Sequence, residues 1–470
     1  MADNTLPYML YFGRGGFQEA RGDCGDGGGD WFVENTIQLL DSVNEFYIDL
    51  TDATGPKVYY WPNNTVLSTS TVVEFGVVQE IIRAEGSSAM PITNLSFRHL
   101  RFEKTYPTHM EGHEVPGGGD WSVHRGGALF LEGVERSSVY DCRFFHLGGN
   151  GVFVSKYARD VEITRNEFYA LGSSAVLLVG DPRFDAPNPH NRSADINHIE
   201  RVRVEENLAN ELGLAVKQSS GVFVAIGRSI MIRRNVFFNI ARAGVVYNDG
   251  FGGNTTLEEN ILFNTVMETL DHGPFNVWDR QQWIQSPTIN PRLFPFRVRR
   301  NLMIGNYNGA KGVDLDDGAR NYDVDDNVLI NALQKFKGND IDVRGNLIFP
   351  VDGGCIWMTP INTDPARMVL ENNTCVSANL PPYYFYLSAT DEQALCRTRN
   401  FISRNNRWFV PRIATNTFRA CGQGPTSWNT WRNTYNQDAG SQTFASVPLA
   451  PDLVSMVISK LRTIFPQPYW

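Results

Sequence analysis

Long apolar runs, an excess of basic residues and closely paired cysteines are all missing from this sequence. No stretch approaches the roughly 18 uncharged apolar residues that a membrane-spanning helix needs, and the start of the chain lacks the basic-then-apolar pattern of a signal peptide. We therefore expect a soluble protein, or a mature or trimmed form of a longer one. The chain has 42 Lys and Arg against 51 Asp and Glu, and this net charge of −9 argues against binding to nucleic acids or to anionic membranes.

The composition is that of a folded protein. Hydrophobic residues make up 42% of the chain and charged residues 20%, which excludes a disordered or collagen-like polymer. The length of 470 residues alone suggests roughly three domains at about 150 residues each. An internal repeat overrides that estimate.

The cysteines and the glycosylation motifs both favour secretion. The six cysteines include no Cys-X-X-Cys pair, so their spacing does not suggest zinc or redox chemistry. The last four, Cys355, Cys375, Cys396 and Cys421, are 20, 21 and 25 residues apart, and we expect at least one disulfide among them. The alternative is buried thiols in a cytosolic chain. Five Asn-X-Ser/Thr acceptor triplets begin at Asn63, Asn94, Asn191, Asn254 and Asn372.

A repeated asparagine dominates the middle of the chain. Eight short strand-like runs each end in an Asn that is followed by mostly apolar residues, and the successive spacings of these Asn are 41, 28, 25, 41, 26, 19 and 27 residues. The spacings cluster near 25, and two of them include about 15 extra residues. The eight positions are Asn166, Asn207, Asn235, Asn260, Asn301, Asn327, Asn346 and Asn373.

This repeat predicts a solenoid of strands. Apolar and charged residues alternate, as in Val202-Arg203-Val204-Glu205, which is the period of a strand and not of a helix. Each unit cannot bury its apolar face alone and must stack on a neighbour, so the Asn side chains are expected to form a ladder at one corner. The pattern resembles the right-handed parallel β-helix of the pectin-lyase-like superfamily, over about residues 90–406.

The two ends lie outside the repeat. We expect residues 1–89 to form an N-terminal β cap or extension, with a strand at Lys57-Val58-Tyr59-Tyr60, because solenoids need their open edges covered. Residues 407–470 should form a C-terminal cap and tail, with a helix over 451–461. Cysteines one coil apart meet the distance that a disulfide needs, which favours the pairs Cys355–Cys375 and Cys396–Cys421.

Acidic residues recur at similar offsets from the Asn positions of consecutive coils. Asp249, Asp271, Asp314 and Asp316 follow their Asn by 11 to 15 residues, and Lys217 follows its Asn by 10. Because adjacent coils stack about 4.8 Å apart, these side chains should lie on one side of the solenoid. The inserts at 181–200 and 278–293 would wall that side.

Three segments concentrate the candidate chemistry. The first, at 271–280, combines Asp271, His272, Trp278, Asp279 and Arg280. The alternative is a purely structural role, in which Asp279 and Arg280 form a surface ion pair and Trp278 packs against the flank of the solenoid.

The second, at 312–319, places Asp314 and Asp316 on one strand face beside Asp317, where two like charges repel and one would titrate late unless a cation lies between them. A calcium site or a solvated acidic turn are the alternatives there. The third segment adds Asn248 to Asp249, in what is otherwise an ordinary turn.

The Tyr-Trp-Pro strand near residue 60, the acidic turn at 314–317 and the preceding His-Gly segment resemble the β-helix proteins related to glycoside hydrolase family 141. The resemblance implies an enzyme that cleaves a polysaccharide with paired aspartates, here Asp271 and Asp316, with Asp249, Asp279 or Asp317 as the alternatives for these roles. It implies no cofactor. Calcium is the one metal kept as an alternative. The residues expected to bind substrate are His272, Trp278, Asp279, Arg280, Lys217, Gln218, Asn248, Asp314 and Asp317.

We thus predict a secreted, monomeric glycoside hydrolase acting on a complex plant or algal polysaccharide. Two other functions remain open. A polysaccharide lyase or epimerase would use Lys217 or Arg280 to abstract a proton from a uronate, and a non-catalytic solenoid would bind carbohydrate or act as an adhesin.

Overall fold

A computed structural model describes most of the central repeat and parts of both ends. The described residues are 33–63, 67–115, 121–181, 197–248, 252–268, 272–278, 291–305, 311–350, 354–358, 367–377, 385–387, 401–410, 418–419 and 427–466.

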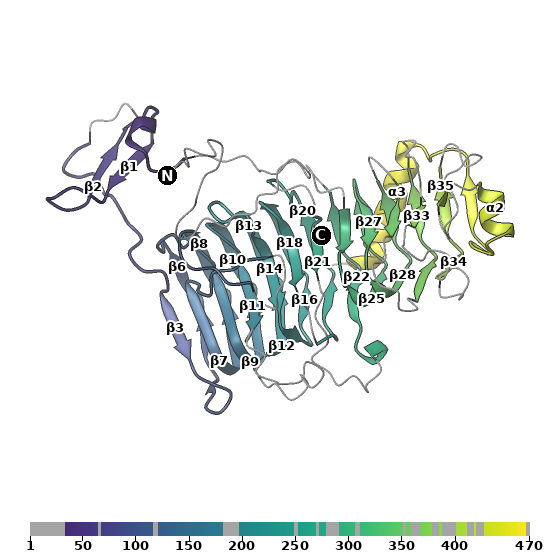
Figure 1. The fold of residues 1–470 in the computed structure, drawn as a ribbon, viewed down its shortest axis with the longest axis horizontal. Helices are drawn as coiled ribbons and strands as arrows, with labels where there is room; N and C mark the ends of the chain where they lie inside the picture. Colours follow the sequence, from purple (N-terminus) through teal and green to yellow (C-terminus); the bar gives the residue numbers. More distant parts are fainter. Residues whose placement is uncertain are drawn as a thin grey trace, which may run out of the picture.

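The chain forms a parallel β-helix, which confirms the predicted fold (Figure 1). Along most of the described solenoid, each coil passes in turn through three parallel sheets, here called sheets 1, 2 and 3 in the order in which a coil visits them. The strands of sheet 1 are β6 (Arg101–Glu103), β8 (Arg143–Leu147), β10 (Glu167–Leu171), β13 (Leu208–Leu212), β17 (Val236–Ile240), β20 (Ile261–Phe263), β23 (Leu302–Ile304), β26 (Val328–Ile330), β29 (Leu347–Phe349), β32 (Thr374–Val376), β35 (Arg407–Phe409) and β37 (Gln442–Phe444).

Sheets 2 and 3 are continuous through two long strands, β7 (Leu129–Tyr140) and β9 (Val152–Thr164). Sheet 2 adds β3 (Ile82–Glu85), β11 (Val176–Gly180), β14 (Ser220–Ala225), β18 (Ala243–Asn248), β21 (Phe275–Trp278), β24 (Lys311–Leu315), β27 (Leu333–Phe336), β30 (Ile356–Met358), β33 (Phe385–Leu387) and β36 (Phe418–Arg419). Sheet 3 adds β4 (Ile92–Thr93), β5 (Ser96–Arg98), β12 (Ile199–Glu205), β15 (Gly227–Arg228), β16 (Met231–Arg233), β19 (Thr256–Glu258), β22 (Phe296–Arg299), β25 (Arg320–Asp325), β28 (Asn339–Arg344), β31 (Met368–Glu371) and β34 (Phe401–Arg404).

Alternation along each strand builds the core. In sheet 2, Val152, Val176, Val222 and Val245 occupy one register position on successive coils, and all are at most 1% exposed in the main core cluster. Their sequence neighbours point to the outer face, because successive side chains of a strand face opposite ways. The core is therefore a continuous apolar column inside the solenoid.

The predicted asparagine ladder is present, at the corner between sheets 3 and 1. Each Asn donates from Nδ2 to the Oδ1 of the Asn on the next coil, as Asn207 does to Asn235 at 3.0 Å, and also to a backbone carbonyl, here that of Ile163 at 2.9 Å. The ladder runs unbroken from Asn166 to Asn406, one Asn beyond the repeat found in the sequence. It thereby pairs backbone groups at a corner where no strand supplies partners.

Two rows of charge run beside this ladder. Two residues before each ladder Asn from Asn207 onward, the sign of the charge alternates from coil to coil in the order Glu205, Arg233, Glu258, Arg299, Asp325, Arg344, Glu371 and Arg404. The strongest contacts include Arg299 Nε to Glu258 at 2.6 Å and Arg404 Nε to Glu371 at 2.9 Å. The residues directly before the Asn repeat the alternation in the order Arg165, Glu206, Arg234, Glu259, Arg300 and Asp326, all with left-handed φ between 53° and 57°.

The N-terminal part begins with a short 3₁₀ helix, η1 (Ile37–Leu39), and an antiparallel pair, β1 (Phe46–Asp49) with β2 (Lys57–Tyr60). Within the described ranges these two strands pair only with each other, and Figure 1 shows the hairpin apart from the first coils. The strand expected at residues 57–60 is present. Its role as a cap and the domain boundaries stay predictions.

At the other end, α2 (Trp428–Asn433) closes the solenoid. The buried carboxylate of Asp438 accepts hydrogen bonds from Trp431 Nε1 at 2.7 Å, from Asn406 Nδ2 at 3.0 Å and from Ser441 Oγ at 2.6 Å. These contacts end the asparagine ladder.

The predicted C-terminal helix is α3 (Ala450–Ile464). Ile464, Met456 and Leu461 pack on the outer face of sheet 1, against Val328 and Leu347. Within the described part of the chain, no helix has the length and apolarity to cross a membrane.

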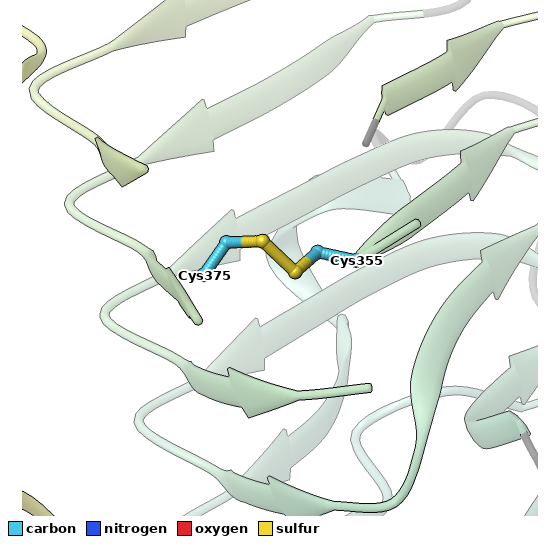
Figure 2. The surroundings of a disulfide bond; sticks show 2 residues. All are labelled: Cys355 and Cys375. Carbon is cyan, nitrogen blue, oxygen red and sulfur yellow. A yellow bond between two sulfur atoms is a disulfide. The ribbon is translucent and has the colours of Figure 1, made fainter. Parts of the chain in front are cut away.

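One predicted disulfide is formed. Cys355, directly before β30, is bonded to Cys375 of β32, and both lie in the core (Figure 2). The bond closes 20 residues, nearly one coil. Cys142 is a buried free thiol, and burial raises its pKa. Cys396 and Cys421 lie outside the described residues.

Candidate functional site

The side chains on the outer face of sheet 2 change from apolar to polar along the solenoid. One register row holds Phe130, Phe153, Leu177, Phe223, Val246, Asn276, Asp314, Lys335 and Trp357 in that order, one residue for each strand from β7 to β30. We call it the outer row. Its first five side chains are apolar and the next three are polar or charged, so the polar part of this row begins at β21.

A loop covers the apolar part of this face. Trp121 and Val123 pack on the outer row, and the backbone N–H of Ser122 donates to Gln218 Oε1 at 2.7 Å. The guanidinium of Arg242 stacks on the Trp121 ring at 4.1 Å. Gln218, predicted to bind substrate, is thus placed where it anchors this loop.

Two aspartates and one lysine form the centre of the polar part. Asp314 lies on the outer row of β24, and Asp316 follows just beyond the end of that strand, where its N–H donates to Val277 O at 2.8 Å. Lys335 of the next coil places its Nζ 3.1 Å from Asp314 Oδ1 and 3.2 Å from Asp316 Oδ2. Lys337 adds a second ammonium, 2.7 Å from Asp316 and 3.4 Å from Asp317.

The two carboxyls ionise differently. Asp314 is fully buried, and this loss of hydration raises its pKa to about 6 although Lys335 favours the charged form. Burial acts on Asp316 in the same direction, but the two lysines outweigh it and lower its pKa. Near neutral or mildly acidic pH, one acid can therefore hold a proton while its neighbour is ionised.

Two buried amide side chains near this pair have atoms without a hydrogen-bond partner in the described part of the chain. Asn248 at the end of β18 is 0% exposed, and neither its Oδ1 nor its Nδ2 has a hydrogen-bond partner among the described residues. Asn276 Nδ2 donates to Asp314 Oδ2 at 3.4 Å, while its Oδ1 has no partner. An unpaired buried amide costs free energy unless a ligand pairs it, so these groups are suited to hold hydroxyls. Trp278, in register with Asn248, is half-buried beside them.

The remaining predicted residues are placed as follows. Lys217 Nζ lies 2.9 Å from the Glu268 carboxylate and 3.2 Å from two backbone carbonyls. His272 is 2% exposed, and its Nε2 is hydrogen-bonded to Arg242 under the covering loop. Asp249, Asp271, Asp279 and Arg280 lie outside the described residues, so their roles stay predictions.

Lys335, Lys337 and Asn276 were not predicted as site residues. The alternation in Gln334-Lys335-Phe336-Lys337 put both lysines on one face, and Lys335 follows Asp314 by 21 residues, about one coil. That spacing is the signal that could have found them. Within the described residues, no group of three or more His, Cys, Asp or Glu is arranged to hold a metal ion.

A pocket of about 530 Å³ lies on the outer face of sheet 3, lined by residues such as Arg201, Asp160, Arg203 and Glu162. Its charges are already paired, with Arg201 Nε 2.7 Å from Asp160 and Arg203 Nη1 3.0 Å from Glu162. The outer face of sheet 2 is the better candidate site, because there buried polar atoms lack partners.

No protein-family model and no curated protein matches the chain. A solved structure described as a glycoside hydrolase superposes with a TM-score of 0.52 at 16% identity, over 72% of this chain and 57% of its own length. The surface protein and adhesin PfbA of Streptococcus pneumoniae follows with a TM-score of 0.45 at 12% identity, over 68% of this chain and 80% of its own. At 16% identity the likeness to the first of these structures shows a shared fold, not a shared activity.

Proposed function

We propose that the protein is a secreted, carbohydrate-active enzyme, a glycoside hydrolase in which Asp314 and Asp316 act as the acid and its partner. The observation that supports this most is the shared contact of both carboxyls with Lys335. The resemblance to β-helix proteins related to glycoside hydrolase family 141 agrees with it. Asp271 stays the alternative acid.

The geometry fits hydrolysis by two carboxyls. Asp314 Oδ1 and Asp316 Oδ2 contact one ammonium nitrogen at 3.1 and 3.2 Å, so these two oxygens lie no more than about 6.3 Å apart, which is below the roughly 6.5 to 9.5 Å of inverting glycosidases and leaves room for the retaining spacing. Protonated Asp314 would donate its proton to the leaving glycosidic oxygen while ionised Asp316 attacks the anomeric carbon, so the bond from that carbon to the leaving oxygen breaks and a glycosyl ester of Asp316 forms. Water, deprotonated by Asp314, would then hydrolyse this ester, which releases the sugar and restores both carboxyls. Lys335 holds Asp316 ionised, because its positive charge favours the carboxylate.

The surrounding groups fit a sugar substrate. The unpaired amides of Asn248 and Asn276 each offer a donor, an acceptor or both to hydroxyls, and the Trp278 indole offers an apolar face to a sugar ring. Access is from the side of Lys337 and Trp278, which are partly exposed whereas Asp314 is buried.

The test is a glycan panel assayed for reducing ends and for the ultraviolet absorbance of unsaturated uronates. Asp314→Asn and Asp316→Asn should each lower turnover on a cleaved substrate by about 10² to 10⁴. Asp141→Asn is the matched control, because that carboxyl is exposed and, among the described residues, its one side-chain ion pair is with the exposed His99. Asp271→Asn belongs in the same series.

Each outcome is informative. Near-full turnover of both variants would overturn the assignment of this pair, and loss of turnover in Asp271→Asn alone would transfer the acid role to Asp271. Products with ultraviolet absorbance would instead favour a lyase. Binding without any product would favour a carbohydrate-binding or adhesion protein.

A further inference from the structure

The outer row of sheet 2 continues past Lys335 to Trp357 of β30. The eight side chains of this row from Phe130 to Lys335 are at most 2% exposed, whereas Trp357 is 39% exposed. Indoles are among the side chains that gain most from burial. A large indole that keeps this exposure directly beside a buried lysine of the candidate site is placed to contact a ligand.

Trp357 and Trp278 flank the acid pair along the solenoid axis. Trp278 is on β21, one strand before Asp314 on β24, and Trp357 is on β30, two strands after it. At roughly 4.8 Å for each strand, the two indoles are separated by about 14 Å along the axis, more than twice the length of one pyranose ring. One monosaccharide cannot contact both.

We propose that Trp357 forms an aromatic subsite for a distal sugar ring of the same polysaccharide chain that is cleaved at Asp314 and Asp316. The substrate then lies along the solenoid axis, with its longer arm on the side of β30, and the protein recognises an oligomer of at least three sugars. This inference rests on the proposed function. The indole would stack on the apolar face of a pyranose, which adds affinity for long substrates.

The experiment compares a length series of the best substrate from the glycan panel, from disaccharide to hexasaccharide. Trp357→Ala should lower the ratio of kcat/KM for the longest to that for the shortest substrate by about tenfold, mainly through a higher KM. Trp357→Phe should restore part of that ratio, because it keeps an aromatic face. Trp61→Ala is the matched control, since Trp61 is 46% exposed at the end of the hairpin, outside this face.

The outcomes separate the two proposals. An unchanged length ratio in Trp357→Ala, or an equal loss on short and long substrates, overturns the subsite while the parent enzyme remains active. A parent that cleaves nothing overturns the proposed hydrolase. In that case the binding of the polymer, measured by tryptophan fluorescence, tests the subsite without catalysis. Equal affinity of the parent and of Trp357→Ala overturns the subsite, and a loss of affinity of about tenfold supports it.

Discussion

Replacing Asp314 with asparagine is expected to stabilise the protein at pH 8 while removing its activity. The pKa of Asp314 is raised from 3.8 to about 6, so the folded protein binds a proton between about pH 4 and pH 6 that the unfolded chain releases. Stability therefore falls as pH rises through this window. A shift of two pKa units lowers the free energy of unfolding above pH 6 by about 3 kcal/mol relative to its value below pH 4.

Asparagine resembles the protonated acid and does not pay this cost at any pH, while Lys335 keeps its contact with Asp316 at 3.2 Å. With an unfolding entropy of about 2.1 cal/mol/K for each residue, 3 kcal/mol corresponds to about 3 °C in a chain of 470 residues. Thermal melting followed by circular dichroism should show Asp314→Asn melting about 3 °C above the parent at pH 8, with the difference vanishing toward pH 4.

Asp316→Asn provides the opposite control. Its pKa is lowered by Lys335 and Lys337 against the effect of burial, so its charge stabilises the fold at pH 8, and the variant should melt below the parent there, with a smaller difference at pH 4. If Asp314→Asn also melts below the parent at pH 8, the Asp314–Lys335 contact is a stabilising ion pair, and the reasoning that marks Asp314 as a catalytic acid is wrong.

Two further predictions concern the fold. Asn260→Ala leaves the N–H of Asn235 and the carbonyl of Ile232 unpaired in the core, so it should lower Tm by about 3 °C, whereas Asn210→Ala, which loses no hydrogen bond, should leave Tm nearly unchanged. Thiol titration of the denatured, unreduced protein should find at most four thiols because Cys355–Cys375 is bonded, and reduction should cost about 3 kcal/mol of stability; six thiols would contradict the disulfide.

The sequence predicted the features that depend on its repeat. The asparagine ladder follows from one residue type recurring at one phase, and the pair Cys355–Cys375 follows from a separation of nearly one coil. The alternating charges were equally visible, because Glu-Glu-Asn at Asn207 is followed by Arg-Arg-Asn at Asn235, but their pairing becomes evident only when the coils are stacked in register.

The candidate site was predictable in part. The alternation of side chains along one strand predicted that Asp314 and Asp316 face the same side, because this pattern depends on neighbouring residues alone. The contact with Lys335 spans two coils, and coil lengths vary from 19 to 41 residues, so a fixed offset from the ladder Asn does not give the partner of a side chain. Covering contacts such as that of Ser122 with Gln218 come from a loop outside the repeat, and no periodicity specifies them.

Because the charges alternate from coil to coil, this chain can gain or lose coils without bringing like charges together only in even numbers. Deleting the coil that holds Glu258 would bring Arg233 against Arg299, and duplicating it would place two copies of Glu258 side by side. Removing or inserting two consecutive coils preserves the alternation. A family of solenoids descended from this chain should therefore differ in length by even numbers of coils, and a designed version that differs by one coil should require every charge beyond the junction to be inverted.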